Sequence, residues 1–172
     1  MRMSDNHDEA RAVARFSVKG ALAASALMFT LDGVPLLYNG MEVGDATESG
    51  DPALFEKLPI FWAPKERPAL RKIYHSLIQL RRQYPALQSQ EVVWLHNSDE
   101  ADVVSYLRAD ATDKLLVVIN FSNRPVTGKL ELADAPQFSR VKIDGLSEGP
   151  EDSLSQLKLK GFEWRIYHRS VK

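Results

Sequence analysis

The sequence predicts an α+β fold in which two helices and one parallel strand come before an antiparallel β-sandwich. Two observations carry this prediction: helical apolar periodicity dominates the chain up to Pro85, and short strand-like runs separated by turn residues follow it. A length of 172 residues, with 44% apolar and 26% charged residues, suits one or two globular domains. We therefore expect a mainly helical domain over residues 1–86 and an all-β domain over residues 87–172.

The first expected helix covers residues 9–31, which are rich in alanine, leucine and methionine, and Asp32-Gly33 supplies its stop signal. Its nearly continuous apolar surface predicts a helix packed between a sheet and other helices. Residues 34–38, VPLLY, are apolar without alternation, which is typical of a buried parallel strand. Residues 39–67 show no sustained period and indicate a long loop.

The second expected helix covers residues 68–84, with Pro68 at its first position and Pro85 directly after its end. One apolar stripe follows the helical period and contains Leu70, Ile73, Tyr74, Leu77, Leu80 and Tyr84. The basic side chains expected to face solvent are Arg71, Lys72, Arg81 and Arg82.

The second half of the chain contains seven strand-like runs in fewer than about 100 residues, which favours an antiparallel sandwich. They are residues 91–96, 102–108, 114–120, 126–132, 138–143, 154–159 and 162–168. The run at 114–120, KLLVVIN, is apolar without alternation and is expected to be the central strand, buried on both faces. The runs at 126–132 and 154–159 alternate, so each should have one solvated face.

Charge and composition exclude several classes of function. The 22 basic and 23 acidic residues are interspersed, so the sequence offers no basic surface for nucleic acid. Without cysteine there is no disulfide, thiolate metal site or thiol nucleophile. The apolar run at residues 21–31 is too short to span a bilayer and is not placed like a signal peptide, so we expect no membrane partner and favour the cytoplasm, although the compartment stays open.

Residues that could carry chemistry begin with Asn6, His7 and Asp8, just ahead of the first helix. In one interpretation Asn6 or Asp8 caps that helix and His7 is incidental. In the other, Asp8 lies between a strand and a helix, where barrel enzymes place catalytic groups. The run GVPLLYNGMEVG at residues 33–44 follows one helix length later and favours the second interpretation, because the two pieces together read as the last strand–helix–strand unit of a barrel.

These segments resemble the α-amylase-type enzymes of glycoside hydrolase family 13. Asn6-His7-Asp8 with Arg11 resembles the family motif N-H-D-x-x-R at the end of barrel strand seven. The strand-eight signature G-x-P-x-x-Y-x-G-x-E is matched by Gly33, Pro35, Tyr38, Gly40 and Glu42. Residues 68–84 resemble the last barrel helix, and residues 103–108, 115–123 and 161–168 resemble strands of the C-terminal domain. The resemblance covers nearly the whole chain and implies a (β/α)8-barrel remnant, with two helices and the final strand, followed by a Greek-key β-sandwich.

The resemblance also implies roles for the site residues. Family members are retaining enzymes acting on α-glucosidic bonds, by hydrolysis or transglycosylation, with one carboxylate as nucleophile and a second as general acid. Asp8 resembles their third carboxylate, which stabilises the transition state, while His7 and Asn6 would contact the sugar. Arg11 either positions the loop or an acidic neighbour, or is a surface arginine. The glycines and proline around Glu42 indicate a structural rather than a catalytic role.

The nucleophile and general-acid motifs are absent from the sequence, so we expect the chain to be inactive alone and to act on an α-glucan only if the missing barrel part is supplied. The remaining carboxylates match neither motif: Asp5, Glu9, Glu42, Asp45, Glu48 and Asp51. No cofactor is expected. The four histidines lack the spacing of a zinc site, so no metal is expected either: His7, His75, His96 and His168.

An alternative function is a non-catalytic module that binds carbohydrate or a protein. Exposed aromatic rings could stack on sugars, and Trp62, in the long loop beside Phe61, is the best candidate, although most aromatic residues should be core. The apolar residues 9–38 would form an adhesive surface without barrel neighbours. This predicts a homodimer, a domain swap, or refolding of residues 1–45 onto the sandwich.

Overall fold

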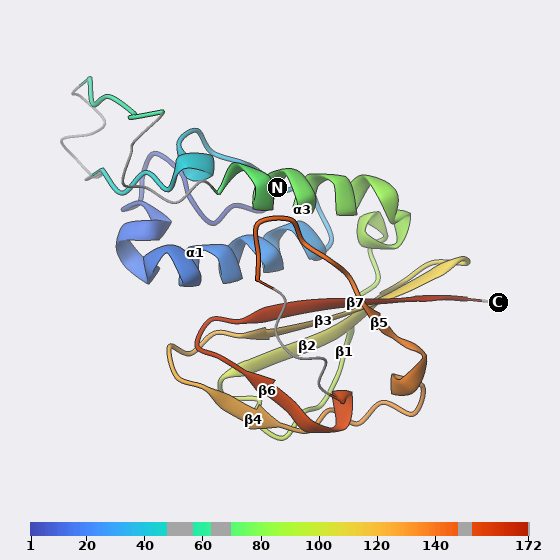
Figure 1. The fold of residues 1–172 in the computed structure, drawn as a ribbon. Coiled ribbons are helices and arrows are strands. Elements are labelled where there is room, and N and C mark those ends of the chain that lie inside the picture. The colour runs from blue at the N-terminus through green and yellow to red at the C-terminus, as the bar shows by residue number, and fades with distance from the viewer. Residues whose placement is uncertain (48–56, 63–69, 148–152, 172) are drawn as a thin grey trace.

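The computed structural model describes residues 1–47, 57–62, 70–147 and 153–171. Its described elements form three layers (Figure 1): two helices cover one face of a five-stranded antiparallel sheet, and a two-stranded sheet lies against the other face. The α+β class and the order of helices before sheets agree with the prediction. The expected division at residue 86 stays a prediction, because one apolar core includes residues from both sides of it.

Helix α1 (Ala12–Thr30) begins three residues later than predicted and is interrupted at Ser17, whose φ of 64° is not helical. Its second part is buried between α3 and β3, as expected for an apolar helix clamped by a sheet and a second helix. The helix is also long and apolar enough to cross a membrane, with a mean hydropathy of 1.3. Half of that stretch is buried inside the described structure, as in many core helices.

The strand expected at residues 34–38 is reduced to one parallel bridge, in which Pro35 pairs with Arg2. The Arg2 amide donates to the Val34 carbonyl (2.8 Å), and the Leu36 amide donates to the Arg2 carbonyl (2.8 Å). Residues 1–3 are therefore a strand remnant that sequence reasoning missed. The segment stays short and half exposed because a parallel strand is normally held by a neighbour on each edge.

Helix α3 (Arg71–Gln83) buries the predicted apolar stripe, although Tyr84 is only half buried. Pro68 lies outside the described residues. Arg81 does not face solvent as expected: its guanidinium is partly buried and donates to the carbonyls of Phe29 (3.0 Å), Leu31 (2.8 Å) and Gly33 (2.5 Å). The reason is that α1 ends beside α3 with no basic residue in its own last turn to satisfy these carbonyls.

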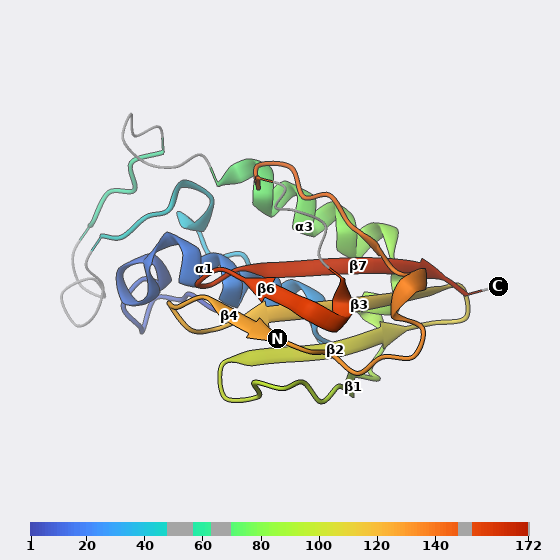
Figure 2. The same cartoon turned by 60° about the horizontal axis from the view of Figure 1, so that its bottom comes forward.

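Each of the seven predicted strands is present, several of them shorter than expected. They are β1 (Val93–Trp94), β2 (Val103–Ala109), β3 (Asp113–Asn120), β4 (Val126–Gly128), β5 (Ser139–Arg140), β6 (Leu157–Leu159) and β7 (Trp164–Ser170). The larger sheet has the order β1-β2-β3-β7-β5, and β4 pairs with β6. Short 3-10 turns are η1 (Met41–Val43), η2 (Pro85–Gln88), η3 (Ala135–Gln137) and η4 (Leu154–Gln156). Figure 2 shows β4 and β6 lying across the larger sheet.

Strand β3 is central and buried on both faces, as its sequence predicted. Leu115, Val117 and Ile119 join the core under the helices, whereas Leu116 and Val118 join the core under β4 and β6. Successive side chains of a strand point to opposite faces, so a strand with an apolar layer on each side must be apolar throughout. One strand thus holds both cores together.

The end of α1 is bound to the sheet through a buried arginine. Arg108 on β2 is fully buried, and it donates to the carbonyl oxygens of Thr30 (2.7 Å) and Ser89 (2.5 Å) and to that of Leu87 (3.3 Å). Arg2 adds an ion pair with Asp32. Together with Arg81, these side chains satisfy carbonyls that the helix cannot pair internally.

Candidate functional site

Asp8 and His7 lie on an exposed loop between the parallel bridge at Arg2 and the start of α1. The Asp8 side chain is 65% exposed, and its Oδ1 lies 3.2 Å from His7 Nε2. No arginine or lysine pairs with Asp8 among the described residues. The loop therefore presents a carboxylate and an imidazole to solvent as a pair.

Asn6 organises this loop without capping α1. Its Oδ1 accepts hydrogen bonds from the backbone amides of Asp8 (2.8 Å) and Glu9 (2.9 Å). Helix α1 begins only after Arg11, with no side-chain cap. The capping interpretation is thus wrong for α1, but the same chemistry closes a turn that sets the direction of His7 and Asp8.

Arg11 is buried, so the structure excludes the surface interpretation of this residue. Its Nε lies 3.3 Å from Asp5 Oδ2 and 3.8 Å from Asp45 Oδ2, and its Nη2 donates to the Asn39 carbonyl (2.7 Å). Its guanidinium also lies over the Tyr38 ring, 5.0 Å from the centroid. One side chain therefore joins the loop before α1 to the segment after it.

The residues of the strand-eight signature support this junction. Gly40 has a φ of 90°, a conformation that favours glycine, and a Cβ on it would lie 2.8 Å from Arg11 Nη2. Gly33 has a φ of 84° at the turn after α1, and Pro35 is the bridge residue. That the signature residues are structural rather than catalytic stays a prediction.

Two carboxylates of the junction, Asp5 and Asp45, are buried, and Glu42 is half buried. Burial raises the pKa of Asp5 above its ordinary value and outweighs the opposing charge of Arg11. Glu42, in η1, has one carboxylate oxygen that is buried without a hydrogen-bond partner among the described residues. Sequence reasoning had left Asp5 and Asp45 among the unassigned carboxylates. The contact of Asp45 with Arg11 spans 34 residues, which leaves no local signal.

The other predicted site residues are not brought to this junction by any contact that the structure records. Trp62 is half exposed and lies between two segments outside the described residues. Glu48 and Asp51 are themselves outside the described range. Within that range, no group of three or more histidine, aspartate or glutamate side chains could hold a metal ion.

A second aromatic site, which sequence reasoning did not single out, lies on the edge strand β1. Trp94 is 59% exposed, and its ring makes an edge contact with the buried Tyr106 ring, at 5.2 Å between centroids. It borders a hollow of about 320 Å³ with Asn97 and Glu100. Trp164, in contrast, is core. Exposure on an edge strand separates Trp94 from the other sandwich aromatics.

Comparison with known proteins gives relatives along nearly the whole chain. The chain is 31% identical over 132 residues to Alpha-amylase MalA of Haloarcula japonica, covering 74% of this chain and 19% of that protein. It is 30% identical over 165 residues to Alpha-amylase 2 of Dictyoglomus thermophilum, covering 90% of this chain and 28% of that protein. The chain thus spans less than a third of the length of these relatives. No protein-family model matches it.

Solved structures show the same fold. The trehalose-6-phosphate hydrolase of Bacillus licheniformis superposes with a TM-score of 0.76 at 18% identity, covering 99% of this chain and 43% of that one. A maltogenic α-amylase, AmyB of Thermotoga neapolitana, superposes with a TM-score of 0.72 at 22% identity, covering 100% of this chain and 41% of that one.

Proposed function

In sequence and fold the chain is a counterpart of the C-terminal part of an α-amylase-like enzyme of glycoside hydrolase family 13, and we propose that it supplies the transition-state-stabilising carboxylate of an α-glucan-active site. The junction at Arg11 carries this proposal. It joins the two motifs while leaving Asp8 and His7 exposed at the start of α1. A charge-stabilising carboxylate must be held in place by its surroundings, and the buried contacts of Arg11 support the loop that carries the exposed Asp8.

The chemical role of Asp8 follows from the charge of the transition state. Cleavage of an α-glucosidic bond passes through an oxocarbenium-like sugar, which is positive. Asp8 has no arginine or lysine partner among the described residues that would neutralise it. It can therefore accept hydrogen bonds from ring hydroxyls and stabilise the positive charge, while His7, 3.2 Å away, donates to the same sugar.

Bond cleavage needs two further carboxylates, held about 5 Å apart in a retaining enzyme. Asp5 and Asp45 are buried around Arg11, so neither reaches a sugar bound outside. Glu9, which precedes α1, is exposed, and its carboxylate forms an ion pair with Arg15, at 3.0 Å. We therefore propose that the chain is inactive alone and acts on α-glucans, by hydrolysis or transglycosylation, when a barrel part carries the nucleophile and the acid.

A chimera tests this function. The part of Dictyoglomus thermophilum Alpha-amylase 2 that precedes the matched region would be fused ahead of this chain, and release of reducing ends from soluble starch would be measured. We expect activity from the chimera and none from the pure chain. Asp8→Asn should lower kcat by roughly 10²–10³-fold, the loss typical of a charge-stabilising group. Glu9→Gln, a change in the next exposed carboxylate, should leave kcat within about twofold. Equal activity of the two variants, or starch cleavage by the chain alone, would contradict the proposal.

A second function, binding of sugar without chemistry, is favoured by one observation, the exposed Trp94 beside a mainly apolar hollow that Asn97 and Glu100 also line. An exposed indole offers a flat apolar face, and the exposed Glu100 carboxylate, one oxygen of which pairs with His96, can accept hydrogen bonds from hydroxyls. Calorimetry with maltoheptaose would test it on the chain itself. Heat of binding that is lost in Trp94→Ala and kept in Trp62→Ala would support a binding module centred on β1; no heat in the parent chain would exclude it.

A further inference from the structure

The larger sheet ends at strand β1, which pairs only with β2 among the described residues. Figure 2 shows β1 as the outermost strand on that side of the sheet. The Leu95 amide donates to the Ser105 carbonyl of β2 (2.9 Å), and alternate residues of an antiparallel strand turn their backbone groups to opposite edges. The amide and the carbonyl of Trp94 therefore point outward, away from β2.

This edge is apolar and lacks the usual protection of an outer strand. Val93 is 43% and Trp94 59% exposed, and neighbouring residues of a strand point to opposite faces, so apolar surface is exposed on both faces. Residues 91–96 contain no lysine, arginine or proline, whereas β5, at the other end of the sheet, contains Arg140 and is followed by Lys142. Such residues keep natural edge strands from pairing with another chain.

We propose that β1 pairs antiparallel with β1 of a second copy of this chain across a two-fold axis, with Trp94 opposite Trp94 of that copy. A two-fold axis brings identical edges together antiparallel. Both outward backbone groups of Trp94 then find their partners in the same residue of the second copy, and the two sheets join into one. The inference goes beyond the proposed function, because the edge lies outside the junction at Arg11.

The side chains that face one another in this register are apolar on both faces of the joined sheet. The two Trp94 indoles lie side by side on the face that carries the Tyr106 ring, with which each indole already makes an edge contact. On the other face, Val93 of each copy lies opposite Leu95 of the other copy. Cross-strand pairs of aromatic and β-branched side chains stabilise antiparallel strands.

The two ends of the edge select this register. A bridge between Asn97 and Leu130 closes the edge at one end, and a pairing centred on Trp94 joins residues 92–96 of both copies without reaching it. A pairing centred one residue earlier brings the Glu91 carboxylate opposite an apolar side chain of the second copy. Removing water from a charge without a partner is unfavourable, so the axis lies at Trp94.

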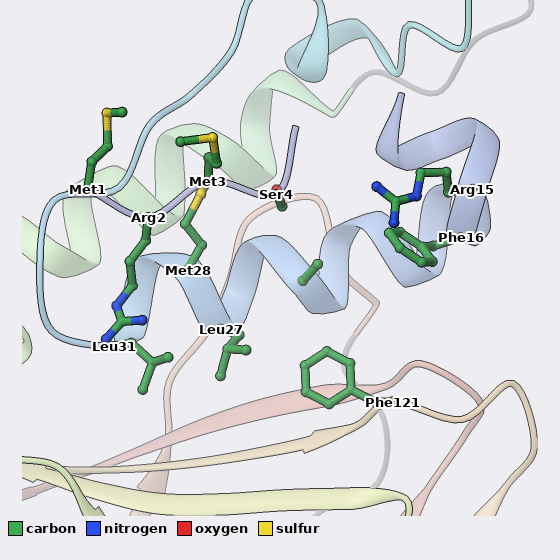
Figure 3. A pocket seen from close by; sticks show the side chains of 11 residues that line it. Met1, Arg2, Met3, Ser4, Arg15, Phe16, Leu27, Met28, Leu31 and Phe121 are labelled. Atoms are coloured by element: carbon green, nitrogen blue, oxygen red, sulfur yellow. The ribbon is translucent and has the colours of Figure 1, made fainter. Parts of the chain in front are cut away.

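A second partly apolar surface is less suited to a contact between copies. A groove of about 540 Å³ runs along α1 (Figure 3), and the homodimer expected through residues 9–38 would use it. Its lining includes Phe16 and Leu27 but also Arg2, Ser4 and Arg15. A symmetric contact there brings arginines of two copies into one interface, where like charges repel. The edge at β1 contains no such charge.

Light scattering of the full chain at increasing concentration tests the dimer. We expect the mass to rise from 19.4 kDa to twice that value only in concentrated solution, because a short edge buries less surface than a standard interface. Val93→Lys places a charge at the edge and should weaken the dimer about tenfold or more. Phe16→Lys is the matched control, because Phe16 is 41% and Val93 43% exposed, and it should dimerise as the parent does. Circular dichroism verifies that both variants fold.

Single cysteines report the register, because the chain has no cysteine of its own. Directly opposite residues of a hydrogen-bonded antiparallel pair have Cα atoms about 5.5 Å apart, within reach of a disulfide. With oxidised glutathione, Trp94→Cys should therefore form a disulfide-linked dimer. Val93→Cys should stay a single chain, because Val93 lies opposite Leu95 and the two cysteines are too far apart to bond. Non-reducing electrophoresis measures both results.

The remaining outcomes contradict the inference. A monomer at every concentration up to about 1 mM would exclude the dimer. A dimer that Phe16→Lys dissociates as strongly as Val93→Lys, or more strongly, would show that β1 is not the contact. Linking through Val93→Cys, or no linking through Trp94→Cys, would exclude the register centred on Trp94.

Discussion

Strand β3 and the strand remnant at residues 1–3 show how differently two parts of this molecule are held. β3 has antiparallel neighbours on both edges and apolar layers on both faces. Residues 1–3 pair on one edge through a single bridge, and Met1 is 77% and Met3 43% exposed. The sheet is stabilised by burial, whereas residues 1–3 are held by the backbone hydrogen bonds of Arg2 and by its ion pair with Asp32.

The strand remnant lies beside the helices, and these are joined to the sheet in two ways. One is the shared core, to which α1, α3 and one face of the sheet contribute. The other is the hydrogen bonds of Arg108, which reach from β2 to the end of α1. If the comparison is right, changes in the sheet unfold the whole molecule, whereas changes at the open face cost little.

The largest effect is expected for Arg108→Ala. It removes the donors of three buried carbonyls, those of Thr30, Leu87 and Ser89, and should lower the free energy of unfolding by about 4 kcal/mol. Urea unfolding would measure the loss. Arg15→Ala is the matched control: its ion pair with Glu9 is exposed, so its removal should cost less than about 0.5 kcal/mol. Similar losses in both variants would mean that Arg108 does not join the two regions.

A smaller effect on stability is expected from leucine-to-alanine changes, which compare the closed core with the open face of α1. Leu115 on β3 is fully buried, whereas Leu27 on α1 is half buried along the groove. Leu115→Ala should cost about 3 kcal/mol and Leu27→Ala about 1 kcal/mol, because the first leaves a cavity and the second a surface that water already reaches. Both values come from urea titrations of the pure chain. A loss at Leu27 as large as that at Leu115 would indicate that the Leu27 side chain is closed to solvent as completely as the core.

The smallest of the three effects is a fall in the free energy of unfolding at alkaline pH, caused by a tyrosine in the helical layer. Burial raises the pKa of Tyr74 to about 12, and its hydroxyl lies 3.1 Å from Ser25 Oγ on α1. A raised folded-state pKa means that the neutral phenol contributes fully below the unfolded value near 10, and that this contribution is lost as pH rises through 12. The free energy of unfolding should fall by up to about 2 kcal/mol between pH 10 and pH 12.

The measurement is the free energy of unfolding as a function of pH, with hydrogen exchange resolved by segment. Tyr74→Phe should remove only the part of this loss that Tyr74 causes, because burial also raises the pKa of Tyr84 and that of Tyr106. In the parent protein, amides of α1 should exchange faster at high pH before those of β3 do. Simultaneous exchange of α1 and β3 would show that the two regions open together and would remove the distinction.

Much of the architecture could be predicted because its signals are local. The run at 114–120 lacks alternation and became the doubly buried β3, and the stripe from Leu70 to Leu80 became the buried face of α3. Gly33 and Gly40 were read as backbone constraints, and both have positive φ. Each of these features depends on neighbours a few residues away, which a sequence pattern records directly.

The site was predicted less completely because its contacts are long-range. Arg11 was left open between two interpretations, and only its burial with Asp5 and Asp45 decided between them. Arg81 was expected in solvent, yet it satisfies carbonyls of α1 that lie about 50 residues away in the chain. Ser17 interrupts a helix that composition predicted to be continuous. No local pattern encodes such partners.

By itself, the sequence determined the class of fold and the order of its elements, because apolar periodicity is a local property of the chain. It also contains the two motifs by which this chain resembles α-amylase-like enzymes. Only the tertiary structure decided that Arg11 binds those motifs together, that Arg108 attaches the helices to the sheet, and that α1 keeps one apolar face open. The physical reason is that burial and hydrogen-bond satisfaction belong to groups brought together in space, and the free energy of each depends on neighbours that are distant along the chain.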